Sequence, residues 1–245
     1  MNLIEVELIK TINGNFFNWN KDIYINESLK KYNGWENEII DECKKFIKPN
    51  SNVIEIGSHI GTHTIPLSKL NYNGFFFAFE MQRFIYQLLI TNAIFNGRSN
   101  IYAFNEAVSD KTEDMLVREV NYGMDPQFNS GNVKIQQIHE AGHLPLRKTT
   151  IDDKFYFLKS LDLIKIDVEC HELNVLKGAL KTIEKFKPVI VTEFHEIKTI
   201  HTNGNKEEIK NLLPNYSWKD ITSECFLNNK KVIGFNMIGT PNEFK

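Results

Sequence analysis

Cysteine is scarce in this chain of 245 residues. Cys43, Cys170 and Cys225 are odd in number and far apart, so they predict neither a disulfide framework nor a Cys-x-x-Cys metal site. Hydrophobic runs are short, and none reaches the about 20 residues that a membrane-spanning helix needs. The first residues carry neither the basic nor the apolar region of a signal peptide. We therefore expect a cytoplasmic protein with no membrane partner.

An excess of positive charge is also missing. The formal net charge is -2 at pH 7, and no cluster of Lys or Arg forms a basic stripe. A protein that binds nucleic acid needs a basic face to neutralise phosphates. We expect no nucleic-acid partner, and a small or neutral substrate instead.

Linkers rich in Pro, Gly or Ser, internal repeats and low-complexity tracts are lacking too. This length and an apolar content of 42% suit one sizeable globular core, so we expect a single domain over residues 1–245. Residues 1–34 form an aromatic, Asn-rich extension in which we expect a strand and a loop. Residues 110–150 lack a regular pattern and are expected to form an insertion beside the substrate, because long irregular segments are usually functional or disordered.

What the sequence does contain is a short apolar run that turns into a helix through two glycines. Val53–Ile56 is mostly β-branched, which predicts a buried parallel strand. Gly57 and Gly61 allow a sharp turn and a close approach to a ligand. Thr62 or Thr64 is expected to cap the helix that follows. The loop is therefore predicted to cradle a ligand.

A second apolar strand, at residues 74–80, ends in the carboxylate of Glu80. In nucleotide-binding α/β sheets such a carboxylate accepts hydrogen bonds from a ribose diol. The glycine loop reads Glu-x-Gly-x-x-x-Gly and lacks the middle glycine of the dinucleotide fingerprint, which lets the backbone approach a pyrophosphate. S-adenosylmethionine is thus favoured as the ligand. The alternatives are an oxidoreductase that binds a nicotinamide dinucleotide and a tight turn that binds nothing.

Strand and helix patterns alternate along most of the chain, which implies a mostly parallel sheet with helices on both faces. One helix is expected to bear Leu173, Leu176, Leu180 and Ile183 on a single face. Two strand candidates, 216–226 and 231–238, are joined across Asn228–Asn229 and predict a C-terminal β-hairpin that adds an antiparallel edge strand. The predicted class is α/β, with the Rossmann-like, seven-stranded sheet of a class I methyltransferase.

Five motifs resemble those of the FkbM-type methyltransferases in order and spacing. They are Glu55–Gly61, Ala78–Glu80, Asn105–Asp110, Thr150–Asp153 and Lys165–Ala179. The resemblance implies O-methylation that depends on S-adenosylmethionine and leaves S-adenosylhomocysteine. The acceptor that it implies is a hydroxyl of a sugar, a glycan or a polyketide-type molecule.

The resemblance also implies which residues surround the cofactor. Glu55, Gly57 and Gly61 would surround its methionine part, Glu80 would bind the ribose, Glu106 and Ala107 would flank the adenine, and Asp167 would line the methyl-donor end. Ser58 and His59 within the first motif, and Thr62 and Met81 next to two of the motifs, complete the expected site. This chain departs from the family where Cys170 replaces a common glycine and where His59 and His171 replace small or amide residues, so we expect a differently shaped turn after Asp167.

Catalysis is expected at the ends of two neighbouring strands. Asp167 and Glu169 are candidates for orienting the acceptor hydroxyl or receiving its proton, although Glu169 has the alternative of capping the next helix. His195 is a candidate base, with an ordinary surface histidine as its alternative. A divalent ion between Asp167 and Glu193 or His195 is conceivable but not favoured, since strand-end acids also occur without metal. A module that binds the cofactor without turnover is a further alternative.

Overall fold

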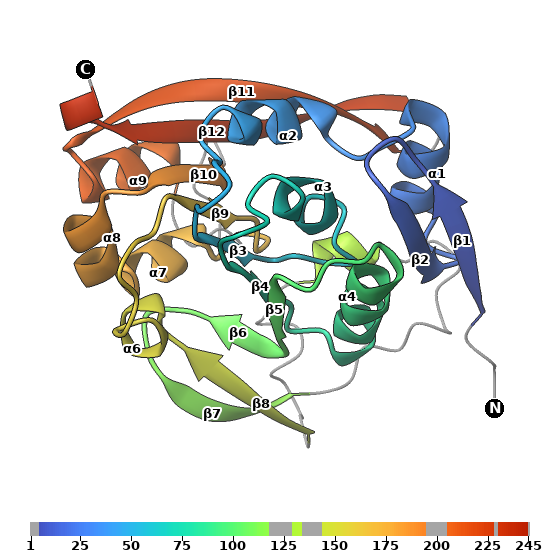
Figure 1. The fold of residues 1–245 in the computed structure, drawn as a ribbon, viewed down its shortest axis with the longest axis horizontal. Helices are drawn as coiled ribbons and strands as arrows, with labels where there is room; N and C mark the ends of the chain where they lie inside the picture. The colour runs from blue at the N-terminus through green and yellow to red at the C-terminus, as the bar shows by residue number, and fades with distance from the viewer. Residues whose placement is uncertain (1–4, 118–128, 134–143, 195–204, 228–229, 245) are drawn as a thin grey trace.

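A computed structural model describes residues 5–117, 129–133, 144–194, 205–227 and 230–244 (Figure 1). Its centre is a seven-stranded sheet in the order β11-β12-β10-β9-β3-β4-β5. The strands are β3 (Val53–Ile56), β4 (Phe76–Phe79), β5 (Ile101–Phe104), β9 (Leu163–Ile166), β10 (Val189–Glu193), β11 (Tyr216–Leu227) and β12 (Lys230–Pro241). The predicted mostly parallel sheet and its C-terminal hairpin are confirmed.

One detail of the predicted sheet is wrong. β12 is the antiparallel strand, and it lies inside the sheet between β10 and β11 rather than at the edge. Its long partner β11 forms the edge and runs along one side of the molecule (Figure 1). The hairpin therefore places its second strand, β12, next to β10, and β12 finds hydrogen-bond partners on both sides.

The register of the central strands positions the site. Ile56 pairs with Phe79 on one side and with Ile166 on the other, so β3, β4 and β9 end at the same level. All three are apolar and buried along their whole length, as a parallel sheet covered on both faces requires. The polar residues that follow these strands consequently emerge together at one edge of the sheet.

Helices cover both faces because alternate residues of each strand point in opposite directions. Val53 packs in a cluster with α2 (Asn37–Lys44) and α3 (Thr64–Ser68). Ile54 and Ile56 pack in another cluster with the helices of the opposite face. Those helices are α6 (Ile151–Lys154), α7 (Glu172–Lys177), α8 (Leu180–Phe186) and α9 (Lys206–Leu212).

Two helix predictions need correction. The single helix expected across residues 173–183 is two helices, α7 and α8, with Gly178 between them. A side chain at Gly178 would place its Cβ 2.0 Å from the carbonyl oxygen of Ser109, so the break lies where another segment packs closely. The helix after the glycine loop begins at Thr64 with His63 in the N-cap position and no side-chain cap, so neither Thr62 nor Thr64 caps it.

Residues 5–34 are more structured than expected. They form a hairpin of β1 (Val6–Lys10) and β2 (Asn15–Trp19), followed by the unexpected helix α1 (Ile23–Tyr32). The hairpin packs on α4 (Arg83–Phe95), where the side chain of Asn92 accepts a hydrogen bond from the backbone of Phe17 at 2.7 Å. This part of the chain is packed against the remainder by its own apolar cluster.

The irregular segment at 110–150 contributes two strands of a small second sheet, which has the order β6-β8-β7. Its strands are β6 (Glu106–Val108), β7 (Glu113–Val117) and β8 (Leu144–Thr149). The described residues include two short 3-10 helices. η1 (Ser130–Asn132) lies between β7 and β8 in the chain, and η2 (Asn242–Phe244) follows β12. None of the helices in the described part of the chain combines the length and the apolar character needed to cross a bilayer.

Candidate functional site

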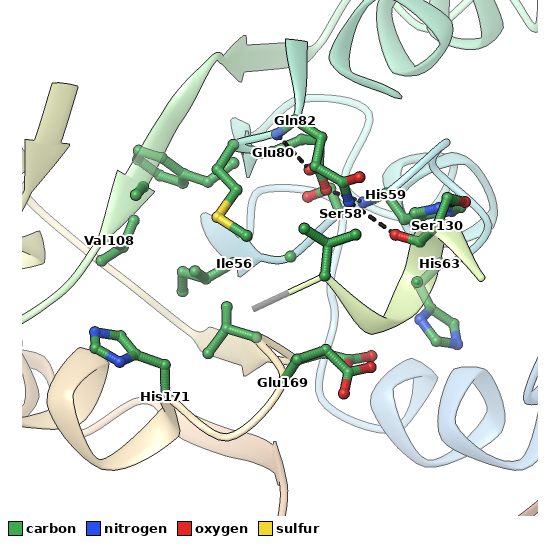
Figure 2. Close-up of a pocket in the computed structure, with 18 of the residues that line it drawn as sticks. Ile56, Ser58, His59, His63, Glu80, Gln82, Val108, Ser130, Glu169 and His171 are labelled. Atoms are coloured by element: carbon green, nitrogen blue, oxygen red, sulfur yellow. Dashed lines mark hydrogen bonds between the residues drawn. The ribbon is translucent and has the colours of Figure 1, made fainter. Parts of the chain in front are cut away.

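A cleft opens where β3, β4 and β9 end (Figure 2). It encloses about 970 Å³ of empty space, a volume that includes its open mouth. Most residues expected to hold the cofactor or the acceptor line it. These are Gly57, Ser58, His59, Thr62, Glu80, Met81, Glu106, Ala107, Asp167 and Glu169.

Three expected site residues are not part of this lining. Glu55 is 1% exposed and lies beneath the loop, where its Oε2 accepts a hydrogen bond of 2.5 Å from the hydroxyl of Thr64. Gly61 is buried against α4, with φ +94°. His195 lies outside the described residues. Glu55 and Gly61 therefore support the loop from behind.

Glycine is needed at position 57 for a reason other than the expected close approach to a ligand. Its φ is +81°, and an added Cβ would meet the carbonyl oxygen of Asp167 at 1.7 Å. Its backbone N–H and that of Ser58 both donate to the carbonyl of Phe79, at 3.0 and 2.8 Å. Gly57 thus permits close packing between the ends of β3 and β9, and these two N–H groups are already engaged within the protein.

Glu80 is held in a fixed orientation by two backbone donors. Its Oε2 accepts from the N–H of His59 at 3.0 Å, and its Oε1 accepts from the N–H of Gln82 at 2.8 Å. Burial raises the pKa of Glu80 to about 7 although these hydrogen bonds favour the carboxylate. Each carboxylate oxygen retains acceptor capacity for a further donor, so this group can still accept hydrogen bonds from a diol.

Asp22 and Ser130 form a hydrogen-bonded group with His59 that the sequence did not predict, and we call these three residues the roof. The hydroxyl of Ser130 donates to Asp22 and lies 2.7 Å from Nε2 of His59, so the imidazole Nε2–H donates to that hydroxyl (Figure 2). Gln82 holds the same short helix η1 through a 2.8 Å hydrogen bond to the carbonyl of Ser130. Nδ1 of His59 is buried and has no partner within the described residues. The only sequence signal was the turn-rich run around Asn129.

The opposite side of the cleft is acidic. Carboxylate oxygens of Asp167, Glu169 and Glu193 lie within 4.8 Å of one another, and we call these three residues the acidic rim. Burial raises the pKa of Glu193 well above its ordinary value, and the charges of Asp167 and Glu169 raise it further. Oε2 of Glu193 has no hydrogen-bond partner among the residues that the structure describes. Glu193 therefore keeps its proton to a higher pH than an ordinary carboxyl group.

The turn after Asp167 has an unusual backbone. Glu169 and Cys170 both have left-handed conformations, with φ +52° and +73°, and glycine is the residue that adopts such values most easily. The side chain of Glu172 closes the turn by accepting from the N–H groups of Val168 and Cys170, at 3.3 and 3.2 Å. Burial raises the pKa of Glu172 to about 7. The left-handed φ explains why glycine would be common at position 170.

His171 supports this turn from the side. Its Nε2 lies 2.9 Å from the hydroxyl of Ser109, and burial lowers its pKa to about 4, so it is neutral at physiological pH. His171 also occupies the N-cap position of α7. The capping alternative for Glu169 is therefore wrong, and its carboxylate belongs to the acidic rim.

Comparison with known proteins identifies the family. Residues 55–217 match the methyltransferase FkbM domain. The structure of methyltransferase FkbM from Methylobacillus flagellatus KT aligns with a TM-score of 0.50 at 16% identity, over 78% of this chain and 44% of that protein. The chain thus spans less than half of that relative's length. No protein with a curated function matches the sequence significantly.

Two further structures align with slightly lower scores. Precorrin-6y C5,15-methyltransferase from Geobacter metallireducens GS-15 aligns with a TM-score of 0.48 at 13% identity, over 84% of this chain and 89% of that one. M. jannaschii TYW2 in complex with AdoMet aligns with a TM-score of 0.49 at 14% identity, over 98% of this chain and 89% of that one.

The residues of the cleft fit S-adenosylmethionine, the methyl donor of such enzymes. The oriented carboxylate of Glu80 suits a ribose diol, and the unpartnered Nδ1 of His59 can accept a hydrogen bond from a ligand. The N–H groups of Gly57 and Ser58 are engaged by Phe79, so the loop presents no phosphate cradle there, which disfavours the dinucleotide alternative. Because the match covers more than half of its length, the chain belongs to the FkbM methyltransferase family.

Proposed function

We propose that this protein transfers a methyl group from S-adenosylmethionine to a hydroxyl oxygen of a sugar or glycan-type acceptor. The observation that carries the proposal is the cleft itself, which has the carboxylate of Glu80, held by two backbone N–H groups, on one side and the carboxylate of Asp167 on the other. The cofactor, when bound, supplies a methyl group on a positively charged sulfur. The chain has to hold the cofactor, orient the acceptor and remove water.

The cofactor would lie along the ends of β3 and β4. Glu80 would accept the ribose hydroxyls, and Asp167 would line the donor end. Ala107 would form the wall at the adenine. The carboxylate of Glu106 is paired with Lys154 at 2.7 and 2.9 Å, so we expect Glu106 to shape this wall rather than to bind a hydroxyl.

Asp167 is the best candidate for the group that meets the acceptor. Its side chain is 28% exposed and reaches the cleft, while Oδ2 accepts a hydrogen bond of 3.1 Å from the ammonium of Lys165. That bond fixes the carboxylate and leaves Oδ1 for an acceptor hydroxyl. An alcohol has a very high pKa, so a carboxylate that accepts its proton typically accelerates transfer by ~10²–10⁴-fold.

The charge of the site supports a hydroxylated small molecule over a nucleic acid. The acidic rim would repel phosphates, and the chain as a whole has a net charge of -2. Sugar hydroxyls, in contrast, are good hydrogen-bond donors to carboxylates. We therefore expect a neutral or cationic polyol as the acceptor.

The test combines a cofactor measurement with an acceptor screen. We expect calorimetry to show binding of S-adenosylhomocysteine, and labelled methyl donor to mark one of a panel of sugars, glycans and small polyols. Asp167→Asn should lower turnover by ~10²–10⁴-fold with little change in cofactor affinity. A protein that does not bind the cofactor, or one that methylates only RNA, would contradict the proposal. Binding without turnover on any acceptor would identify a non-catalytic binding module.

A further inference from the structure

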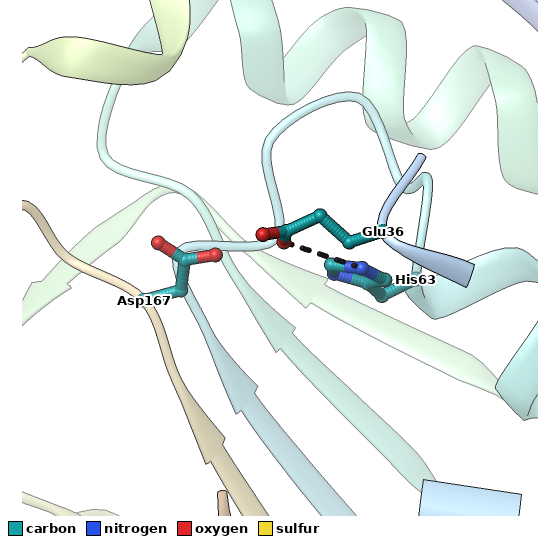
Figure 3. Close-up of side chains that lie close together, drawn as sticks. All are labelled: Glu36, His63 and Asp167. Carbon is teal, nitrogen blue, oxygen red and sulfur yellow. Dashed lines mark ion pairs between the residues drawn. The ribbon is translucent and has the colours of Figure 1, made fainter. Parts of the chain in front are cut away.

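Three side chains that the sequence analysis did not connect converge beside the cleft (Figure 3). Glu36 comes from the residue before α2, His63 from the residue before α3, and Asp167 from the end of β9. One donor atom of each lies within 4.8 Å of the others. Nε2 of His63 and Oε2 of Glu36 are 3.7 Å apart, which is too long for a hydrogen bond.

The imidazole of His63 is buried without a partner at the atom that faces this cluster. His63 is only 3% exposed, and its Nε2 makes no hydrogen bond to any residue that the structure describes. A buried polar atom without a partner is costly, and buried polar groups are rarely left in this state. The position of Nε2 beside two carboxylates therefore points to a missing ligand rather than to ordinary packing.

Three carboxyl groups and one ammonium lie around His63. Lys165, which is 2% exposed, places its ammonium 3.1 Å from Asp167 and 3.6 Å from Glu55. One ammonium thus faces the three carboxylates of Glu36, Glu55 and Asp167. A protein interior tolerates ions when they are paired. A divalent cation would bring the net charge of the three carboxylates and the ammonium to zero.

The backbone and the neighbours of Glu36 aim its side chain at the cluster. Glu36 has φ +41°, a left-handed conformation that a residue with a side chain rarely adopts, and such strain is often found at functional sites. The hydroxyl of Ser223 donates to Oε1 of Glu36 at 2.5 Å. Oε2 is consequently left on the side of His63.

We propose that Glu36, His63 and Asp167 bind a divalent transition-metal ion such as Mn²⁺ or Zn²⁺. Two carboxylates and one imidazole are a donor set that suits these ions. Donors that are each about 2.1 Å from an ion lie roughly 3.0–3.4 Å apart, so a small side-chain rotation brings the observed 3.7 Å pair into range. His63 and Asp167 both line the cleft, so a bound ion would face a ligand there.

A role for this ion in the reaction rests on the proposed function, whereas binding of the ion does not. With the ion bound, neighbouring hydroxyls of a polyol acceptor would contact the ion in place of Oδ1 of Asp167, because hard and borderline cations bind oxygen donors. The site would therefore select a diol over an isolated hydroxyl. Ion binding and cofactor binding can be measured separately on the same protein.

The experiment uses the full chain, stripped of metal with a chelator and then titrated with Mn²⁺. We expect calorimetry to show one ion per chain. Loss of a residue that only supports a metal ligand already weakens binding by 10–100-fold in other proteins, so Glu36→Gln and His63→Gln should each weaken Mn²⁺ binding by at least ~100-fold. Glu38→Gln is the matched control, because Glu38 is exposed and two residues away from Glu36, and it should leave the affinity unchanged.

Pulsed electron paramagnetic resonance of Mn²⁺ on the unsubstituted protein keeps the test valid if a variant fails to fold. We expect a hyperfine coupling from one imidazole nitrogen. Absence of Mn²⁺ and Zn²⁺ binding, absence of that coupling, or equal weakening by Glu38→Gln would overturn the proposal. S-adenosylhomocysteine binding without ion binding contradicts only the metal site, and ion binding without S-adenosylhomocysteine binding contradicts only the proposed function.

Discussion

The carboxylates on the two sides of the cleft differ in their hydrogen-bond partners. On the side of β3 and β4, Glu80 receives one backbone N–H on each oxygen. On the side of β9 and β10, the acidic rim brings three carboxylates together, and Oε2 of Glu193 has no partner among the described residues. The carboxylate of Glu80 thus has hydrogen-bond partners before any ligand binds, while Glu193 gains from a cation or from a hydrogen-bond donor.

This difference separates the two tasks of the site. A preorganised acceptor such as Glu80 binds a ligand without having to rearrange, which suits a cofactor that is the same in every turnover. Crowded carboxylates raise one another's pKa and are costly to keep ionised. They therefore favour a ligand that supplies positive charge or hydrogen-bond donors. Each of the following changes tests one part of this contrast.

The largest effect is expected at Lys165, whose ammonium lies under the acidic side. Burial opposes its charge, but Asp167, Glu55 and Glu36 outweigh burial and raise its pKa. Lys165→Met would leave Glu55 and Asp167 without their cation, so the free energy of unfolding at pH 7 should fall by about 3–5 kcal/mol. Denaturant unfolding measures this loss.

The control for Lys165 is an exposed ion pair. Lys187 and Glu243 are both largely exposed, so Lys187→Met should change the free energy of unfolding by less than ~1 kcal/mol. Similar losses in the two variants would show that Lys165 does not compensate the buried carboxylates.

The next largest effect is expected at Gly57, where the two sides of the cleft touch. Gly57→Ala would drive a methyl group into the carbonyl of Asp167 and would also strain a φ of +81°. Overpacking and left-handed strain together should cost about 3 kcal/mol and abolish cofactor binding. The matched control is Gly97→Ala, because Gly97 has φ +67° and open space around it. It should cost only about 1–2 kcal/mol and leave cofactor binding intact. Equal costs at the two positions would rule out the contact with Asp167 as the cause.

The Glu80 side should show a pH dependence of cofactor binding. Its pKa is raised from 4.5 to about 7 by burial, so in the free protein the carboxyl gains a proton as the pH falls through 7. The ionised form accepts hydrogen bonds from a diol, so affinity for S-adenosylhomocysteine should fall between pH 8 and pH 6, by at most about tenfold per pH unit. Calorimetry at several pH values measures this slope.

Glu80→Gln isolates this titration from Glu36 and Glu172, whose pKa values are also about 7. The variant should bind more weakly and lose most of the slope, whereas an unchanged slope would assign it to another group. The linkage to folding has the opposite sign. Because the folded-state pKa of Glu80 lies above its ordinary value, its contribution to stability is greatest below pH 4.5 and is lost as the pH rises to 7.

The smallest effect is expected at Glu193 on the acidic side, and it has the reverse sign. Burial first, and then the neighbouring carboxylates, raise the pKa of Glu193, so the ionised form is costly in the metal-free protein. Glu193→Gln should therefore raise the free energy of unfolding at pH 8 by about 1 kcal/mol. At pH 5, where Glu193 already carries its proton, the gain should vanish. A loss of stability at pH 8 would show that the rim is already compensated.

Local patterns were sufficient for much of the fold. The apolar runs of β3 and β4 predicted buried strands, and Glu80 and Asp167, which follow β4 and β9, both line the cleft. The helix α1 was missed because half of its residues are polar and its burial depends on packing against other segments. The break at Gly178 was missed for a similar reason, since the obstacle there is the distant carbonyl of Ser109.

The sequence by itself determined the alternation of strands and helices around the central sheet, the glycine turn and the family, because periodicity and motif spacing are properties of neighbouring residues. Only the tertiary structure decided that Asp22, Ser130 and His59 form one roof, although Asp22 and Ser130 are 108 positions apart. It also decided that Glu36 and His63 face Asp167. Contacts between distant segments follow from how the helices pack on the sheet, and no local pattern encodes that geometry.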